Sequence, residues 1–353
     1  RDWSSDVCSS DLVTIAEDTS TLQSSTKTKT DDKQFADTPS TNNSVRIERT
    51  KSAEINPPKI LYTPISVPNK KELPENEAVI PGKNNVSIPT QLPVVPEKSK
   101  DPISGSWKSD KDVFKIDTIF SGVKKLVYKG TYNDRVSING SSRNDVSMAY
   151  NFDSKSKGLI VRKKNNREVS YEIKDSVLYI QSKNNTKYVV AFGYSAIKEE
   201  MNFELPENIQ VDIQTVYGDI AAKSIKESDI KIKTSHGDIT TGDISGNIDL
   251  RSGYGDIEMQ NAHGNIDIFT NYGDISGEKV FVKEHCVSGT KYGDIRFQLI
   301  NKISECTLNS ETNYGDIKIK REDLKTKSGG QIMIGNGTTK VNLKTNYGDI
   351  LIQ

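Results

Sequence analysis

The tetrapeptide Tyr254-Gly255-Asp256-Ile257 decides the fold, because it recurs throughout the C-terminal part of the chain. Identical copies begin at Tyr217, Tyr272, Tyr292, Tyr314 and Tyr347, and the variant His236-Gly237-Asp238-Ile239 stands between those of Tyr217 and Tyr254. The glycines of successive copies are 19, 18, 18, 20, 22 and 33 residues apart. Such a period is typical of a repeat protein in which each repeat forms one coil, with loops inserted in later coils.

The residues before each copy have the pattern of a β-strand. Apolar residues alternate with polar ones, as in Ile248 and Leu250 or Ile266 and Ile268, and period two indicates a strand. A hydroxyl residue stands three positions before each glycine: Thr215, Thr234, Ser252, Thr270, Thr290, Thr312 and Thr345. Stacked coil upon coil, the alternating apolar residues and the isoleucines that end the copies are expected to form the interior, each stabilising it by roughly 1.5–3 kcal/mol. The sequence therefore predicts an all-β, single-chain β-solenoid (β-helix) with about 18–22 residues per coil.

The Gly-Asp pairs are interpreted as structural corners of the coils. Glycine allows positive φ and close approach of the backbone, and Asp is expected to cap its own corner by accepting backbone N–H bonds. Asn247 and Asn265 in the half-motifs Gly246-Asn247 and Gly264-Asn265 favour capping, because capping needs only a side-chain oxygen. The predicted corner residues are Gly218, Asp219, Gly237, Asp238, Gly255, Asp256, Gly273, Asp274, Gly293, Asp294, Gly315, Asp316, Gly348 and Asp349.

A bound calcium ion is the alternative for the Asp residues. Gly and Asp at nine-residue steps resemble the calcium-binding β-rolls, although the Gly-Gly-x-Gly part of their motif is absent here. We predict no catalytic, cofactor-binding or metal residues, and no cofactor. His285 beside Cys286 lacks further ligands at useful spacing, and Cys286 and Cys306, one coil apart, are expected to be neighbouring buried thiols more readily than a disulfide.

The aromatic residue before each glycine has two interpretations. Identical residues on successive coils stack by geometry, which predicts an aromatic ladder that stiffens the rod. Tyrosine also keeps a polar end, so the same residues form a candidate interaction stripe for sugars or a partner protein: Tyr217, His236, Tyr254, Tyr272, Tyr292, Tyr314 and Tyr347.

The composition divides the chain into four parts. Of 12 prolines, only Pro206 lies beyond Pro102. Residues 1–12 resemble the translated read-through of a sequencing adaptor, and residues 13–105, rich in Pro, Ser, Thr and Lys, predict a disordered tether. Short alternating runs over residues 106–203 predict a β-rich start or cap, and residues 204–353 the repeat solenoid. The thinned copy Ser328-Gly329-Gly330-Gln331-Ile332 is expected to supply the extra coil within the 33-residue step.

The charge balance and hydropathy exclude some partners. Lys plus Arg and Asp plus Glu number 48 each, so no net charge favours nucleic acid. No apolar run reaches the 18 or so residues that a membrane helix needs. A signal peptide, lipid anchor or membrane helix can still precede the chain, since its true N-terminus is expected to be missing.

The Thr-x-Tyr/His-Gly-Asp-Ile repeats, preceded by the segment from Phe203 to Thr215, resemble the bacterial putative-adhesin family, a domain of unknown function built of Gly-Asp-Ile/Val repeats. The resemblance covers roughly residues 120–353. It implies a β-solenoid in a periplasmic or cell-surface protein, often behind an N-terminal anchor, with no catalytic residues.

Three functions are compatible with this pattern. The first is a non-enzymatic extracytoplasmic or cell-surface module that binds a surface glycan or protein through its repetitive faces. The second is a β-helix polysaccharide lyase or hydrolase, which would need a unique acid and base, whereas the acids here are copies of one another. The third is a polymerising scaffold, in which an exposed end coil such as Leu351-Ile352 joins the edge of the next molecule.

Overall fold

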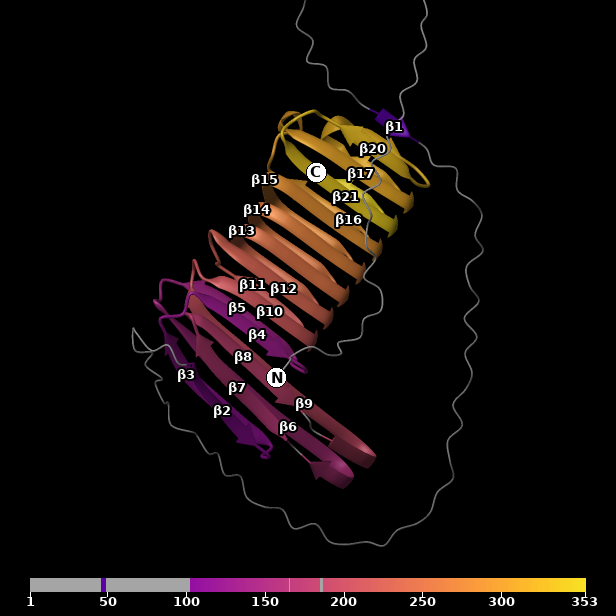
Figure 1. The fold of residues 1–353 in the computed structure, drawn as a ribbon. Coiled ribbons are helices and arrows are strands. Elements are labelled where there is room, and N and C mark those ends of the chain that lie inside the picture. The colour runs from indigo at the N-terminus through magenta and orange to yellow at the C-terminus, as the bar shows by residue number, and fades with distance from the viewer. Residues whose placement is uncertain (1–45, 49–101, 165, 185–186) are drawn as a thin grey trace, which may run out of the picture. The chain divides into compact units, whose positions relative to one another are not determined.

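The computed structural model describes residues 46–48, 102–164, 166–184 and 187–353, which belong to one compact unit, Asn43–Gln353. Their strands form a single 22-stranded sheet (Figure 1). The predicted artefact at residues 1–12 and most of the predicted tether lie outside the described residues. Three residues inside the predicted tether, Arg46–Glu48, form the strand β1.

The part that precedes the repeats is all-β, as predicted. Its strands are β2 (Ile103–Ser109), β3 (Val113–Ser121), β4 (Lys125–Gly130), β5 (Arg135–Ser141), β6 (Asp145–Lys164), β7 (Arg167–Lys174), β8 (Val177–Asn184) and β9 (Lys187–Pro206). Antiparallel pairs such as β2 with β7 and β3 with β6 form its outer end, and β4 and β5 pair parallel with the first repeat. The proposed domain boundary at residue 203 falls within β9 and stays a prediction.

The repeats form the remaining strands. They are β10 (Gln210–Tyr217), β11 (Asp219–Lys223), β12 (Ser228–His236), β13 (Ile239–Tyr254), β14 (Ile257–Tyr272), β15 (Ile275–Tyr292), β16 (Ile295–Leu299), β17 (Cys306–Tyr314), β18 (Ile317–Ile319), β19 (Leu324–Thr326), β20 (Gly330–Ile334), β21 (Thr339–Tyr347) and β22 (Ile350–Ile352). The described helices are two short 3-10 turns, Ile303–Glu305 and Lys320–Glu322. No helix in the described part of the chain is long and apolar enough to cross a bilayer.

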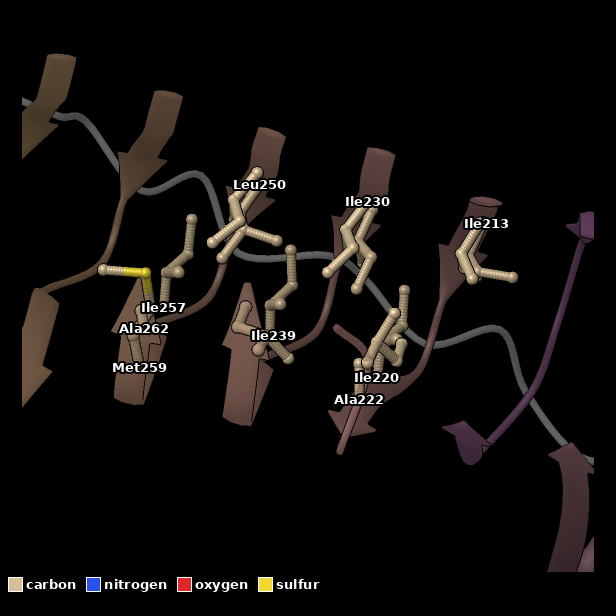
Figure 2. Packing of buried hydrophobic residues seen from close by; sticks show 14 of the residues in the cluster. Ile213, Ile220, Ala222, Ile230, Ile239, Leu250, Ile257, Met259 and Ala262 are labelled. Carbon is tan, nitrogen blue, oxygen red and sulfur yellow. The ribbon is translucent and has the colours of Figure 1, made fainter. Parts of the chain in front are cut away.

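Each coil contributes one strand segment to each of two walls, and the interior lies between them. The long strands β13, β14 and β15 pair in both walls. Alternate residues are buried along both strands, and Figure 2 shows Leu250 and Ile230 of one wall pointing toward Ile257 and Ile239 of the other. Identical positions lie opposite one another in neighbouring coils, as Ile239 does with Ile257. This confirms the predicted β-solenoid with its apolar interior.

The coils do not stack in the order of the sequence. The strand β21, which leads to the last tetrapeptide, pairs parallel with β15 on one side and with β17 on the other. The strand β22 likewise lies between β16 and β18. The C-terminal coil is therefore inserted between two coils that precede it in the sequence, so the order of the aromatic residues along the stack ends Tyr292, Tyr347, Tyr314.

This insertion corrects three predictions about the C-terminal end. Leu351 and Ile352 do not form an exposed end coil, because β22 is paired on both sides. The thinned copy from Ser328 to Ile332 does not form an extra coil; its β20 runs antiparallel to β17 at the end of the stack. Cys286 and Cys306 are free and buried but not adjacent, since β21 lies between their strands.

A buried polar cluster lies in the β-rich part that precedes the repeats. The Glu199 carboxylate is 1% exposed and accepts hydrogen bonds from the Tyr150 hydroxyl at 2.9 Å and the Asn184 side-chain amide at 2.8 Å. Burial raises the pKa of Glu199 from 4.5 to about 7, although these two bonds and the nearby Arg167 favour the charged form.

The raised pKa of Glu199 in the folded state makes the stability of this protein depend on pH. Glu199 is neutral in the fold and ionised in the unfolded chain between about pH 4.5 and 7, so its contribution to stability is present at acidic pH and lost as the pH rises through about 7. We expect the loss to be on the order of 2–3 kcal/mol. Urea unfolding at pH 5 and pH 8 measures it: Glu199→Gln should remove the loss, whereas Glu200→Gln, at the neighbouring residue that pairs with Lys198, should retain it. Equal pH dependence in wild type and Glu199→Gln would contradict the assignment.

Candidate interaction surface

The aromatic residues of the repeat form one continuous stack, defined here as the aromatic column. Ring centroids of neighbours are 4.8–5.0 Å apart and the ring planes differ by only 0–18°. Tyr132 adds a tilted ring at one end, 5.5 Å from Tyr217. In spatial order the column is Tyr132, Tyr217, His236, Tyr254, Tyr272, Tyr292, Tyr347 and Tyr314.

The column is both a ladder and an exposed surface, so the two predicted roles are compatible. Its repeat tyrosines are 41–52% exposed. Each inner ring is stacked between two neighbouring rings, which cover both of its faces. The surface available to a partner therefore consists of ring edges and phenol hydroxyls. The column therefore offers a line of identical amphipathic contacts with the spacing of the coils.

The glycines after the aromatic residues keep this spacing small. The φ angle at Gly273 is +151°, and a Cβ there would lie 2.2 Å from the carbonyl oxygen of Gly255. The other corner glycines show the same close approach to the backbone of the preceding level. Only glycine meets both conditions, so the corner can form in every coil without spreading the stack.

The aspartates form a second column beside the aromatic one. Each carboxylate accepts a backbone N–H bond from the Asp of the next coil in the stack rather than within its own corner, except that Asp316, the last of the column, accepts from the Ser328 N–H at 3.1 Å. The Asp256 N–H bonds to Asp238 Oδ1 at 2.8 Å, and the Asp274 N–H bonds to Asp256 Oδ1 at 2.8 Å. Through the inserted coil, the Asp349 N–H bonds to Asp294 and the Asp316 N–H bonds to Asp349. These bonds offset the repulsion between stacked carboxylates and link neighbouring coils.

The hydroxyl residues complete the corner from the inside. Ser252 Oγ donates to the Gly237 carbonyl at 3.0 Å, and Thr270 Oγ1 donates to the Gly255 carbonyl at 3.0 Å. The glycine, aspartate and isoleucine N–H groups of these corners also have partners on neighbouring coils. These backbone groups are therefore already hydrogen-bonded within the fold, and a partner would contact the side chains of the corner.

The second corner of the coil has a shorter amide column. Asn247 Nδ2 donates to Asp229 Oδ1 at 2.8 Å, and Asn265 Nδ2 donates to Asn247 Oδ1 at 3.2 Å. The predicted half-motifs thus form corners of their own, where Gly246 and Gly264 have positive φ.

A groove of about 520 Å³ lies on the wall that follows the Asp column. Its lining includes Thr240, Glu258, Ser276 and Arg296. Arg296 also forms ion pairs with Asp274, at 3.1 Å, and with Asp294. Sequence reasoning missed both Tyr132 and this groove, because neither belongs to the repeated tetrapeptide.

The sequence predicts no metal site, with calcium bound by the Asp residues as the alternative. His285 Nε2 lies 3.9 Å from Asp267 Oδ1. Over the residues whose placement is described, no group of three or more His, Cys, Asp or Glu side chains could hold a metal ion. Burial raises the pKa of the Cys286 thiol to about 12.

The stacked coils and their exposed columns define a repeat β-solenoid, and the comparison with family models agrees with this class. A family model described as Toastrack DUF4097 matches residues 108–353. The chain belongs to this family, which confirms the resemblance predicted from the repeats.

Two solved structures are similar to this chain. A putative cell adhesion protein from Clostridium sporogenes is 13% identical, with 68% of this chain and 98% of that chain covered and a TM-score of 0.33. A putative adhesin from Bacteroides fragilis is 14% identical, with 69% and 98% covered and a TM-score of 0.31. A search of curated proteins found no match. The family description names no enzymatic activity.

Proposed function

We propose that this chain is a non-enzymatic, extracytoplasmic or cell-surface interaction module that binds through its aromatic column. The observation that carries the proposal is the distribution of exposed apolar surface. Twelve large hydrophobic side chains are exposed in the described part of the chain, and seven of them are tyrosines of the column. Exposed apolar surface gathered in one patch marks interaction sites more often than the same surface scattered singly.

The geometry of the column favours a repetitive partner. Its contacts recur every 4.8–5.0 Å along seven coils, so a chain of repeating units can meet many of them at once. Individually weak contacts then combine into high avidity. A linear surface glycan supplies such repeats, together with hydroxyl groups for the phenols and C–H groups for the ring edges. A protein partner would contact a shorter part of the column.

The test is to remove the middle of the column while keeping the fold. Tyr254→Gln, Tyr272→Gln, Tyr292→Gln and Tyr347→Gln in one variant should lower the apparent affinity for isolated cell envelopes and their polysaccharides by at least about tenfold, because exposed tyrosines are frequent binding hot spots. Far-UV circular dichroism checks that the variant remains folded.

The matched control removes exposed apolar side chains elsewhere. Val113→Gln, Tyr179→Gln and Ile300→Gln change residues that are 42–55% exposed and lie outside the column. This control should bind as the wild type does. Unchanged binding by the column variant, or an equal loss in the control, would contradict the proposal. Binding that survives removal of the glycans by periodate would assign the partner as a protein.

A further inference from the structure

The C-terminal end of the stack has two edge strands of opposite character. The strand β19 has three residues, Leu324–Thr326, and carries Lys325 with Lys327 just beyond it. The strand β20 has five residues, Gly-Gln-Ile-Met-Ile, and no charge. Short edges with lysine resist the addition of another strand, whereas a longer uncharged edge accepts one. The edge of β20 is therefore the one that needs a cover.

The side chains of β20 add to this requirement. Ile332 and Ile334 point into the core, at 0% and 2% exposed, while Met333 on the opposite face is 41% exposed. One edge of β20 pairs antiparallel with β17. The other edge pairs antiparallel with β1, with Arg46 opposite Met333, Ile47 opposite Ile332 and Glu48 opposite Gln331.

The strand β1 and the next strand in the sequence, β2, lie at opposite ends of the same wall. The wall begins with β2 and ends with β1. Its strand order is β2, β7, β8, β4, β10, β12, β13, β14, β15, β21, β17, β20, β1. Figure 1 shows β1 beside β20, at the end opposite β2. Twelve strand spacings of about 4.8 Å amount to roughly 58 Å.

The chain between β1 and β2 is long enough for this connection. Residues 49–102 separate the two strands, and a chain of that length reaches up to roughly 180 Å when extended. The contact is also intramolecular, so it is favoured over a contact with another molecule at low protein concentration. The chain thus supplies its own cover for the β20 edge.

We propose that the outer edge of β20 is a strand-accepting interface for a second copy of this chain, and that β1 occupies this edge in the single molecule. The second copy fits because two antiparallel β20 strands are self-complementary about a two-fold axis. Centred on Ile332, the pairing places Gln331 of each copy opposite Met333 of the other, so both methionines lie at the interface. This pairing closes on itself as a dimer, so it differs from the polymerising scaffold considered from the sequence, and it is independent of binding through the aromatic column.

The experiment frees the edge in the full chain. Arg46→Pro with Ile47→Pro removes two consecutive N–H donors and so prevents β1 from pairing. Light scattering coupled to size-exclusion chromatography should then give about twice the mass of the wild type at the same protein concentration, with dissociation on dilution. Amide exchange over Gly330–Ile334 should accelerate in the dilute variant.

Two additions make the result specific to β20. Adding Met333→Lys to the double proline variant places a charge on the edge and should restore the mass of the wild type. Adding a peptide of residues 43–50 in excess should do the same. A double proline variant with the mass of the wild type would overturn the proposal, whether or not its amide exchange accelerates, as would a dimer that Met333→Lys leaves intact.

Discussion

Removal of residues 338–353 is expected to unfold the C-terminal part of the solenoid rather than shorten it by one coil. The deleted strands β21 and β22 lie between β15 and β17 and between β16 and β18. Without them, β17 and β18 lose their parallel partners and a gap opens inside the stack. Four buried aliphatic residues, Val341, Leu343, Ile350 and Ile352, are lost, which is worth roughly 6–12 kcal/mol. This is comparable with the whole stability of a typical domain, about 5–15 kcal/mol.

Limited proteolysis with mass spectrometry checks this expectation. Cleavage should appear between residues 300 and 335, while the coils from β10 to β14 stay protected. A milder pair of variants gives the control: Leu343→Ala in the inserted coil should cost about 2–5 kcal/mol, and Leu324→Ala at half-buried β19 should cost clearly less. A truncated protein that keeps residues 306–334 protected would show that the inserted coil is dispensable.

The second large effect is expected at the corner glycines. In Gly273→Ala the new methyl group would lie 2.2 Å from the Gly255 carbonyl oxygen, at a φ of +151°. The neighbouring atom is backbone, so relief requires that two coils separate. We expect a loss of at least about 2–3 kcal/mol in the free energy of unfolding, together with weaker protection of the adjacent corners.

The matched control is Gly242→Ala, two coils away in the stack. A Cβ at Gly242 would meet only Lys223 Cγ at 3.8 Å, which is ordinary contact. Chemical unfolding should therefore separate the two alanine variants by at least about 2 kcal/mol. If they unfolded at the same denaturant concentration, the glycine corners would not be the tight junctions described above.

The content of a single coil was predictable from the sequence, because every role within it is local. Alternation identified the buried residues, such as Ile248 and Leu250, and the recurrence of Gly-Asp identified the corner. The partner of each Asp was less predictable. A turn residue normally bonds within its own turn, but here the stacking places the next coil's N–H, at 2.8 Å, within reach of the carboxylate.

The order of the coils was not predictable, for a physical reason. Every coil presents nearly the same edge to its neighbours, so Tyr292 can stack on Tyr314 or on Tyr347 with similar local geometry. The choice depends on the loops and on the antiparallel strands β19 and β20, of which β20 carries only the thinned copy of the repeat. The same difficulty explains the wrong placement of Cys286 beside Cys306, because spacing along the chain does not give spacing along the stack.

The β1 strand shows another limit of reasoning from composition. Arg46–Glu48 lies in a segment rich in polar residues and proline, and nothing local distinguishes it from its surroundings. Its partner is the outer edge of β20, more than 280 residues later in the chain. The periodicity of a sequence does not predict such strand partners, which lie far apart in the chain.

The inserted coil also matters for the proposed function. Tyr347 stacks on Tyr292 at 5.0 Å and on Tyr314 at 4.8 Å, so it joins two parts of the aromatic column that are otherwise separate. The length of the proposed binding surface therefore depends on the C-terminal residues of the described chain.

Cysteine cross-linking measures this order most directly. Equivalent Cα atoms of adjacent coils lie about 4.8 Å apart, within the range of a disulfide. In coils that have one coil between them, these atoms lie roughly 9.6 Å apart, which is beyond that range. Under mild oxidation, Tyr292→Cys with Tyr347→Cys and Tyr314→Cys with Tyr347→Cys should each form a disulfide, identified by peptide mapping. Tyr292→Cys with Tyr314→Cys should not. A ready disulfide in this last pair, with none between positions 292 and 347, would contradict the inserted coil and the continuous aromatic column.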